Sequence, residues 1–433
     1  MNPRKIVKKL IPKKLFKTIE PYGHLGEAIL FQTLNGFPAK KLKIIGVTGT
    51  NGKTSTCFLI HRMLHEAGYK VGLMTTVGYG VGEEIKPQIE HMTTVSVPLL
   101  IKRIKAMREA GVEWLVFETT SHALAQHRVW GVPYDIAVMT NITHEHLDYH
   151  GTFEHYRDAK RMLFKQANRS RGLKAGVINA DDPSADLFKG DVKKPLLYGI
   201  THGDLKARGI KLTPEEVSYS VSYDHMDYQI SCNLPGSFNV YNSLAAVSVG
   251  VLLGLNKAQI EKGIAALKSV EGRMTTINEG QPFSAIVDFA HTPDSFEKLF
   301  KDIRPSVKGK LIVLFGSAGR RDEGKRSVQG KLAGKYADEV VITEEDDRDV
   351  DGNEIMNQIA EGAIVSGKVK DKDLFLVHDR TSAIKFALSR AKPNDTVLLL
   401  GKGHEKTIER ADGEHPWNEI QITRDALREI VKN

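Results

Sequence analysis

Short apolar runs, each followed by a helical pattern, recur along most of the chain. Four lie at 44–47, 71–74, 114–117 and 136–139, and a second series lies near 285–289, 311–315, 340–343, 374–377 and 397–400. This alternation predicts α/β domains with parallel, doubly wound sheets, in which ligands gather at the carboxyl ends of the strands. We therefore expect two α/β domains, with a long helical pattern at 241–267 and a linker near 270–274. An alternating segment at about 201–238 predicts antiparallel strands attached to the first domain.

The amino-acid composition excludes several classes of protein. The 433 residues, 41% hydrophobic and 26% charged, are typical of a globular protein with two or three domains. The longest apolar run, 244–255, is too short for a membrane span and predicts a core helix. Two cysteines, Cys57 and Cys232, exclude a disulfide framework and a zinc ribbon, so we expect a cytoplasmic location.

The positive charge is concentrated at the start of the chain. The net charge is +8, and seven cations precede the first acid, Glu20. The rest of the chain is nearly neutral, so a nucleic-acid partner is not expected. Interleaved apolar residues resemble a short basic amphipathic helix interrupted by Pro12, which predicts either a peripheral contact of residues 1–17 with an anionic membrane surface or partner, or a solvated tail. The cations are Arg4, Lys5, Lys8, Lys9, Lys13, Lys14 and Lys17.

A phosphate-binding loop follows the first predicted strand. The sequence Thr-Gly-Thr-Asn-Gly-Lys-Thr at 48–54 precedes a helical pattern that ends at Gly68. Backbone N–H groups and the helix N-terminus would hold phosphates, while Lys53 reaches the β- and γ-phosphates and Thr54 holds Mg²⁺. The motif departs from the common spacing because Val47 replaces the first glycine. We expect nucleotide contacts from Gly49, Thr50, Asn51, Gly52, Lys53, Thr54 and Ser55.

Two further strand ends carry metal-binding side chains. Glu118 follows the third strand, and His146 follows the fourth within Asn-Ile-Thr-His-Glu-His-Leu-Asp-Tyr-His-Gly at 141–151. Adjacent strand ends beside a phosphate loop could let both residues share one Mg²⁺. From the residue pattern alone, we expect Lys160 to be a lysine on a helix with its side chain in solvent.

These motifs resemble a known family. Residues 49–54 look like the ATP loop of the Mur ligases, which form amide bonds in cell-wall peptides, and of the related folylpolyglutamate synthetases. Ser-His-Ala-Leu at 121–124, the run 141–151 and Gly-Lys-Gly-His-Glu at 401–405 are similar to the E-type Mur ligase. The resemblance implies ATP, two Mg²⁺ sites and a carbamylated Lys160 that acts with Glu118, His146 and Lys53 as the catalytic set; Glu145 replaces a usual Asp.

The resemblance also implies binding residues. ATP contacts are expected from Asn239, Asn242, Arg273 and Asp288, although helix capping is an alternative role for the two asparagines. A basic turn at 316–326 is expected to face the cleft. Arg348 suits the carboxylate of diaminopimelate, whereas the acidic stretch 344–349 suits lysine, and diaminopimelate is preferred. Acceptor and amino-acid contacts are expected from Thr93, Thr94, Ser121, His122, Arg128, Arg348, Gly401 and Glu405.

The combined hypothesis is an ATP-dependent ligase that adds diaminopimelate or lysine to a peptide precursor such as UDP-N-acetylmuramoyl-dipeptide through an acyl phosphate. We expect a short basic segment at 1–43, a P-loop central domain at 44–271 and a Rossmann-like C-terminal α/β domain at 272–433. Only 43 residues precede the first strand, so a front UDP-binding domain of the family kind is expected to be shortened or absent. The alternatives are a folylpolyglutamate-synthetase-like ligase and a non-catalytic ATP-binding scaffold.

Overall fold

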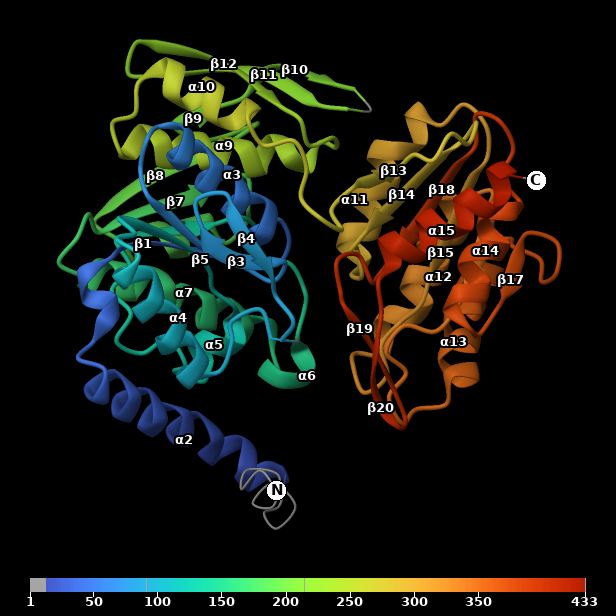
Figure 1. Cartoon of the computed structure of the whole chain (residues 1–433), viewed down its shortest axis with the longest axis horizontal. Helices are drawn as coiled ribbons and strands as arrows, with labels where there is room; N and C mark the ends of the chain where they lie inside the picture. Colours follow the sequence, from blue (N-terminus) through green and yellow to red (C-terminus); the bar gives the residue numbers. More distant parts are fainter. Residues whose placement is uncertain (1–12, 91, 214, 433) are drawn as a thin grey trace.

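The computed structural model describes the backbone of residues 13–432 except 91 and 214, with side chains from residue 19 onward. Two α/β bodies lie side by side, and a long helix runs along the outer edge of the first (Figure 1). The chain passes from one body to the other between α10 (Lys257–Ala265) and β13 (Thr275–Ile277), the stretch that holds the predicted linker.

The first body is built on a nine-stranded sheet. Its strands are parallel except for a hairpin at one edge, so the prediction of a doubly wound sheet is confirmed. The four predicted strands are present, and the hairpin and three further strands were not predicted. In spatial order they are β4 (Glu84–Pro87), β3 (Gly78–Val81), β2 (Val71–Met74), β5 (Trp114–Glu118), β1 (Lys43–Thr48), β6 (Ile136–Met139), β7 (Ala175–Asn179), β8 (Lys194–Gly199) and β9 (Leu205–Lys206).

Helices cover both faces of this sheet. The central strands are buried on both faces, which is why they appear in the sequence as continuous apolar runs. One hydrophobic cluster joins the sheet to α3, α9 and α10, and another joins it to α4, α5, α7 and α8. These helices are α3 (Lys53–Glu66), α4 (Val97–Glu109), α5 (Ser121–Ala125), α7 (Phe153–Arg169), α8 (Ala185–Lys189) and α9 (Phe238–Leu252); the short α6 (Leu147–His150) precedes α7.

The helical pattern at 241–267 forms two helices, α9 and α10. The break lies at Gly254, whose φ of 70° is in the left-handed region that favours glycine. Asn256 then caps α10 in a capping box with Gln259. Antiparallel strands β10 (Arg208–Leu212), β11 (Val217–Tyr223) and β12 (Met226–Cys232) pack beside these helices, as expected.

The second body contains a six-stranded sheet, parallel except at β13. All five predicted strands are present, whereas β13 and a small hairpin were not predicted. The strand order is β13, β14 (Ser284–Asp288), β18 (Thr396–Leu400), β15 (Leu311–Phe315), β16 (Glu339–Ile342) and β17 (Leu374–Leu376). The hairpin is β19 (Thr407–Arg410) and β20 (Gly413–Pro416), and the helices are α11 (Pro293–Ile303), η2 (Arg304–Ser306), α12 (Gly324–Tyr336), α13 (Gly352–Val365), α14 (Arg380–Ser389) and α15 (Glu419–Lys432).

In the described part of the chain, α2 (Lys13–Leu34) precedes the first sheet and is followed by η1 (Pro38–Lys41). Pro21 lies inside it. The predicted contact segment 1–17 falls on residues 1–12, outside the described part, and on the first turns of α2, whose side chains are also outside it. Among the described helices, none is both long enough and apolar enough to cross a membrane.

Candidate functional site

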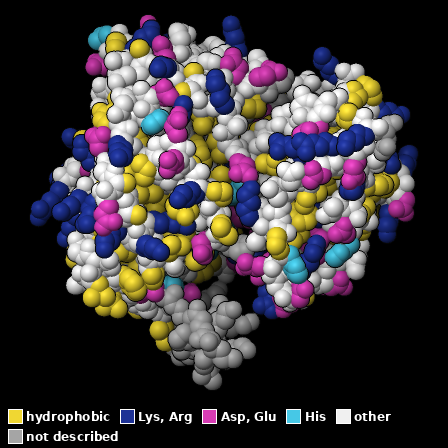
Figure 2. All heavy atoms as spheres, viewed as in Figure 1, with side chains coloured by type: hydrophobic (Ala, Val, Ile, Leu, Met, Phe, Trp, Pro, Cys, Tyr) yellow, Lys and Arg dark blue, Asp and Glu magenta, His cyan; other side chains and the backbone are white. Residues whose placement is uncertain are grey.

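A cleft of about 910 Å³ lies between the two bodies (Figure 2). The carboxyl ends of β1, β5 and β6 face it from one side, and those of β14 and β18 face it from the other. Such strand ends are where doubly wound sheets bind ligands. The cleft is lined by the predicted residues Thr50, Asn51, Gly52, Lys53, Thr54, Ser55, Thr93, Glu118, His146, Asn239, Asn242, Arg273, Asp288, Arg348, Gly401 and Glu405.

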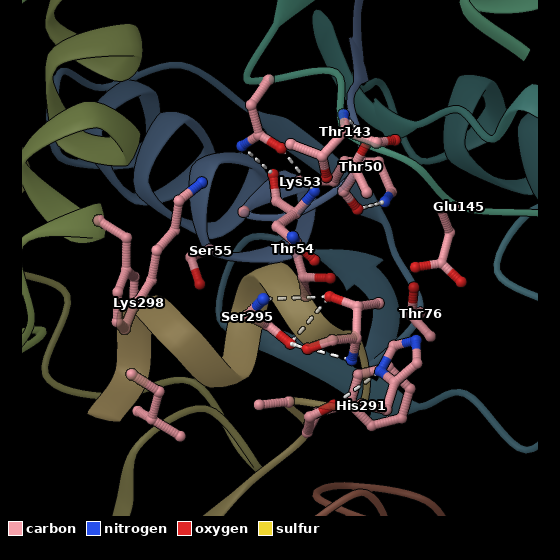
Figure 3. A pocket seen from close by; sticks show the side chains of 18 of the residues that line it. Thr50, Lys53, Thr54, Ser55, Thr76, Thr143, Glu145, His291, Ser295 and Lys298 are labelled. Atoms are coloured by element: carbon pink, nitrogen blue, oxygen red, sulfur yellow. Dashed lines mark hydrogen bonds between the residues drawn. The ribbon is translucent and has the colours of Figure 1, made fainter. Parts of the chain in front are cut away.

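The phosphate loop joins β1 to the first turn of α3. Gly49 and Gly52 have positive φ values of 149° and 81°, so the loop turns tightly and its N–H groups precede a helix N-terminus. The Lys53 ammonium donates to the carbonyl oxygens of Gly49 at 3.0 Å and Thr50 at 2.7 Å. Lys53 therefore folds back over the loop, beside Thr54 (Figure 3).

Glu118 lies directly beside the phosphate loop. Its Oε2 atom accepts hydrogen bonds from Thr54 Oγ1 and from the backbone N–H of Thr76, each at 3.0 Å. Arg273 from the second body donates to the same Thr54 hydroxyl at 3.2 Å. Hydroxyl and carboxylate oxygens next to a phosphate loop form a donor set that suits Mg²⁺.

Lys160 lies beneath the loop rather than in solvent. Its buried Nζ atom donates to the Gly49 carbonyl oxygen at 2.6 Å. Burial, together with the charge of Lys53, lowers the pKa of Lys160 well below its usual value. Burial also lowers the pKa of Lys53 and raises that of Glu145 on the facing turn. The site thus gathers basic side chains whose protonated forms an anionic phosphate would stabilise.

A cluster of imidazoles adjoins Lys160. The ring of His146 lies edge-on to that of His122, with 4.6 Å between centroids, and the next turn brings in His150. Burial lowers the pKa of His146, and lowers those of His122 and His150 to about 3 and about 4. These rings are therefore neutral at pH 7, the form in which imidazole binds metal. His150 Nε2 is 3.0 Å from Ser121 Oγ, a contact that the sequence did not indicate.

No group of three or more His, Cys, Asp or Glu side chains that could hold a metal occurs in the described part of the chain. A divalent ion here would therefore need hydroxyl, phosphate or carbamate oxygens besides Glu118 and His146. Mg²⁺ is commonly held in this way, by one or two carboxylates together with substrate phosphates. The residues present are compatible with that kind of site.

Three of the predicted acceptor-binding residues, Thr93, Thr94 and Arg128, differ in how closely they approach the cleft. Thr93 Oγ1 lies 2.9 Å from Thr76 Oγ1 and lines the cleft. Thr94 is buried, and its hydroxyl donates to the Glu118 carbonyl oxygen at 3.2 Å. Arg128 donates to the carbonyl oxygens of Thr94 and Val95. Thr94 and Arg128 therefore shape the loop behind Glu118, while Thr93 alone of the three reaches the cleft.

The wall formed by the second body is both charged and aromatic. The Arg273 guanidinium lies 4.4 Å from the centroid of the Phe289 ring, and its buried Nε has no hydrogen-bond partner among the described residues. Asp288 accepts from the backbone N–H groups of Met274 and Ala290, both at 2.7 Å. An unpartnered buried donor facing a phosphate loop is suited to a phosphate oxygen.

The charged side chains of the predicted amino-acid pocket mostly form ion pairs with one another. Arg348 Nε donates to Glu409 Oε2 at 2.7 Å, and Glu405 forms an ion pair with the buried Lys402. Lys402 also donates to Asp346 at 2.9 Å. Glu345 lines the same wall, and burial raises the pKa of its carboxyl group. The acidic stretch therefore balances nearby cations and still presents carboxylates to the cleft.

The two predicted asparagines belong to the first turns of α9. Asn242 Nδ2 donates to Asn239 Oδ1 at 2.8 Å, and a Cβ atom at Gly52 would collide with Asn242 Oδ1. Asn239 Nδ2 donates to the Pro235 carbonyl oxygen at 2.7 Å. Neither side chain caps α9 at its N-cap position, which is Ser237. Asn242 instead packs on the phosphate loop.

Contacts across the cleft include residues that the sequence did not single out. Asn51 of the phosphate loop donates to Asp294 Oδ2 of α11 at 2.9 Å. His291, Ser295 and Lys298 line the wall beside it (Figure 3). From the basic turn at 316–326, Arg321 and Lys325 line the cleft, while Arg320 pairs with Asp349 outside it. The sequence signal nearest to His291, Ser295 and Lys298 was Asp288, three residues before His291, and it did not single them out.

Two family descriptions match the chain. Residues 47–250 match the Mur ligase middle domain, and residues 272–403 match the Mur ligase glutamate ligase domain. A UDP-N-acetylmuramyl-tripeptide synthetase of Roseiflexus sp. (strain RS-1) is 39% identical over 426 residues, covering 95% of this chain and 83% of the relative. A UDP-N-acetylmuramoyl-L-alanyl-D-glutamate–2,6-diaminopimelate ligase of Geobacillus thermodenitrificans (strain NG80-2) is 39% identical over 416 residues, covering 95% and 84%.

Solved structures show the same architecture. A UDP-N-acetylmuramoyl-L-alanyl-D-glutamate–2,6-diaminopimelate ligase superposes with a TM-score of 0.63 at 29% identity, covering 95% of this chain and 83% of that one. A folylpolyglutamate synthase of Mycobacterium tuberculosis superposes with a TM-score of 0.73 at 16% identity. The superposition covers 94% of this chain and 95% of the synthase. At that identity the second likeness shows the fold alone.

Proposed function

Because the chain belongs to the Mur ligase family and is an ATP-dependent ligase, we propose that it joins an amino acid to a UDP-linked muramoyl dipeptide through an acyl phosphate. The observation that supports this most strongly is the contact of Glu118 with Thr54 in a cleft lined by Lys53 and Arg273. On this proposal, Lys53 and Arg273 would lie where phosphate charge develops.

The proposed reaction has two steps. An acceptor carboxylate oxygen attacks the γ-phosphorus of ATP, and the bond to ADP breaks as the acyl phosphate forms. The amine nitrogen then adds to the acyl carbon, phosphate leaves with the bonding electron pair, and the amine proton passes to solvent. Lys53 and Arg273 offset the phosphate charge, and the facing bodies exclude water from the acyl phosphate.

Members of the family use Mg²⁺, which when bound neutralises phosphate charge. We propose two such sites, with Thr54 holding one ion and Glu118, His146 and Lys160 the other. Lys160 would contribute after carbamylation, because its lowered pKa favours the neutral amine that reacts with CO₂. A carbamate would turn a buried cation into an anionic oxygen ligand.

We further propose that Asn239, Asn242 and Asp288 contact ATP, and that Thr93, Ser121, His122 and Arg128 bind or shape the acceptor subsite. For the incoming amino acid, diaminopimelate is preferred over lysine. Arg348, Glu405 and Gly401 all line the cleft, so its second-body wall would offer both a cation and carboxylates to a substrate that carries both charges. The diaminopimelate ligases among the relatives support the same preference.

The cytoplasmic location, the domain boundaries at 43/44 and 271/272, and a membrane contact of residues 1–17 stay predictions. The alternative of a folylpolyglutamate-type ligase is not favoured, because the matched relatives are muramyl-peptide ligases.

The test is product formation from a UDP-linked muramoyl dipeptide and ATP, with diaminopimelate or lysine, followed by mass spectrometry. We expect the diaminopimelate tripeptide as the main product. Lys53→Ala and Glu118→Ala should each lower the rate by at least about a hundredfold. Glutamate addition to a folate with no tripeptide formed, or unchanged turnover in both variants, would contradict the proposal.

A further inference from the structure

The outward face of α2 is an apolar surface for which the ligase reaction has no use. Five of its large apolar side chains are exposed by 42–72%, whereas Ala28 and Gln32 on the opposite side are buried. Successive members lie three, seven, one and four residues apart, which places all five on one face of the helix. These residues, which we call the α2 stripe, are Ile19, Tyr22, Ile29, Leu30 and Leu34.

The stripe is held in a fixed position on the first body. Ala28 packs with Val97 and Ile101 of α4, and Phe31 packs against the same cluster. Gln32 Nε2 donates to the Trp130 carbonyl oxygen at 3.1 Å. Figure 1 shows α2 along the outer edge of the first body, so a surface that contacts the stripe leaves the cleft open.

Acidic side chains avoid the stripe, and cations flank it. The acids of α2 are Glu20, which interacts with Arg128 and Tyr149 of the body, and Glu27, which pairs with His24 and is only 18% exposed. Lys40, Lys41 and Lys43 are exposed just after the helix. In the sequence, seven cations stand before the stripe with no intervening acid.

We propose that α2 lies on an anionic phospholipid surface, with the stripe at the boundary of the acyl chains and the flanking cations at the headgroups. An apolar helix face bordered by cations is typical of helices that lie in a membrane interface. The described helices contain no membrane span, so the contact would be peripheral. A second copy fits the stripe less well, because the partner helix would bring the same cations and no exposed acids to balance them.

The experiment is flotation of the full-length protein with vesicles of phosphatidylcholine, with or without 30% phosphatidylglycerol. Binding should require the anionic lipid and weaken in 1 M salt. Leu30→Glu combined with Leu34→Glu should lower the partition coefficient at least tenfold. The matched control, Ile364→Glu with Val365→Glu, changes two residues of α13 that are also exposed, by 51% and 74%, and should bind as the wild type does.

Lys8→Gln with Lys9→Gln tests the charge separately and should lower binding by more than tenfold, since each cation near an anionic surface favours binding about fivefold. Equal binding by wild type and the α2 double variant, or equal binding to neutral vesicles, would overturn the proposal. A wild-type dimer in light scattering that the α2 double variant converts to monomer would assign the stripe to a second copy. Tripeptide formation from a soluble acceptor should be unchanged in the α2 variant, which separates this proposal from the ligase assignment.

Discussion

At the scale of single residues, the character of the site depends on where Lys160 lies. A lysine in a 17-residue helix with a polar face reads as solvated, yet this one is buried against the Gly49 carbonyl oxygen. Desolvation and Lys53 both favour its neutral form. A buried amine whose neutral form is favoured, and which interacts with Glu118 and His146, is the group from which a carbamate ligand could form.

Replacing Lys160 by Arg should therefore remove activity. An arginine keeps the positive charge but cannot be carbamylated, so we expect turnover to fall at least about a hundredfold. Wild-type enzyme in CO₂-free buffer should lose activity and regain it with bicarbonate, and ¹³C-labelled bicarbonate should give a carbamate NMR signal that Lys160→Arg lacks. Full activity of the variant would contradict a carbamate role.

The sequence could predict residues at strand ends but not their partners. Glu118 and Thr54 meet because β1 and β5 are neighbours in a parallel sheet, and the pattern of apolar runs indicated such a sheet. The Ser121 to His150 contact and the Asn51 to Asp294 contact join residues 29 and 243 positions apart through loops and domain placement. A local sequence pattern does not indicate contacts between residues so far apart in the chain.

At the scale of elements, most strands buried on both faces were predictable because each is a continuous apolar run; β7, which is equally buried but contains Gly176 and ends in Asn179, was missed. The hairpins β3–β4 and β19–β20 were missed because they are short, with half-exposed and mixed residues. The break between α9 and α10 was missed because the apolar spacing continues across Gly254, whose positive φ ends the helix. At this position the backbone conformation ended the helix, although the apolar spacing continued.

Helix α3 carries a buried imidazole that should make stability depend on pH. Burial lowers the pKa of His61 to about 4, and its Nε2 has no hydrogen-bond partner among the described residues. The unfolded chain takes up a proton near pH 6.5, whereas the folded chain does so only near 4, so stability falls as pH drops between these values. The loss from His61 between pH 7 and pH 5 is about 2 kcal/mol.

Urea unfolding at pH 7 and pH 5 measures this effect. His61→Leu should lose less stability between the two pH values than wild type, by about that amount. His65, which stacks on His61 but is only partly buried, gives the matched control His65→Leu, for which the wild-type pH dependence should persist. Identical pH dependence in wild type and His61→Leu would exclude the effect.

At the scale of the whole molecule, polar contacts join the two bodies across the cleft. Asn51 and Asp294 join the phosphate loop to α11, and Arg273 joins Thr54 to the second body. Asp294→Ala should lower kcat/KM about tenfold, because a charge-assisted contact between the bodies is lost. Lys298→Ala removes the other partner of Asp294 within α11 and should have a smaller effect on the steady-state rate.

The central claim is that this cleft forms an amide bond through an acyl phosphate. The most direct measurement supplies an acceptor with ¹⁸O in the reacting carboxylate and analyses the released phosphate by mass spectrometry. The account predicts one ¹⁸O atom in phosphate for each amide bond formed, with both the acceptor and the amino acid required for sustained phosphate release. Tripeptide formed without ¹⁸O in phosphate would contradict it.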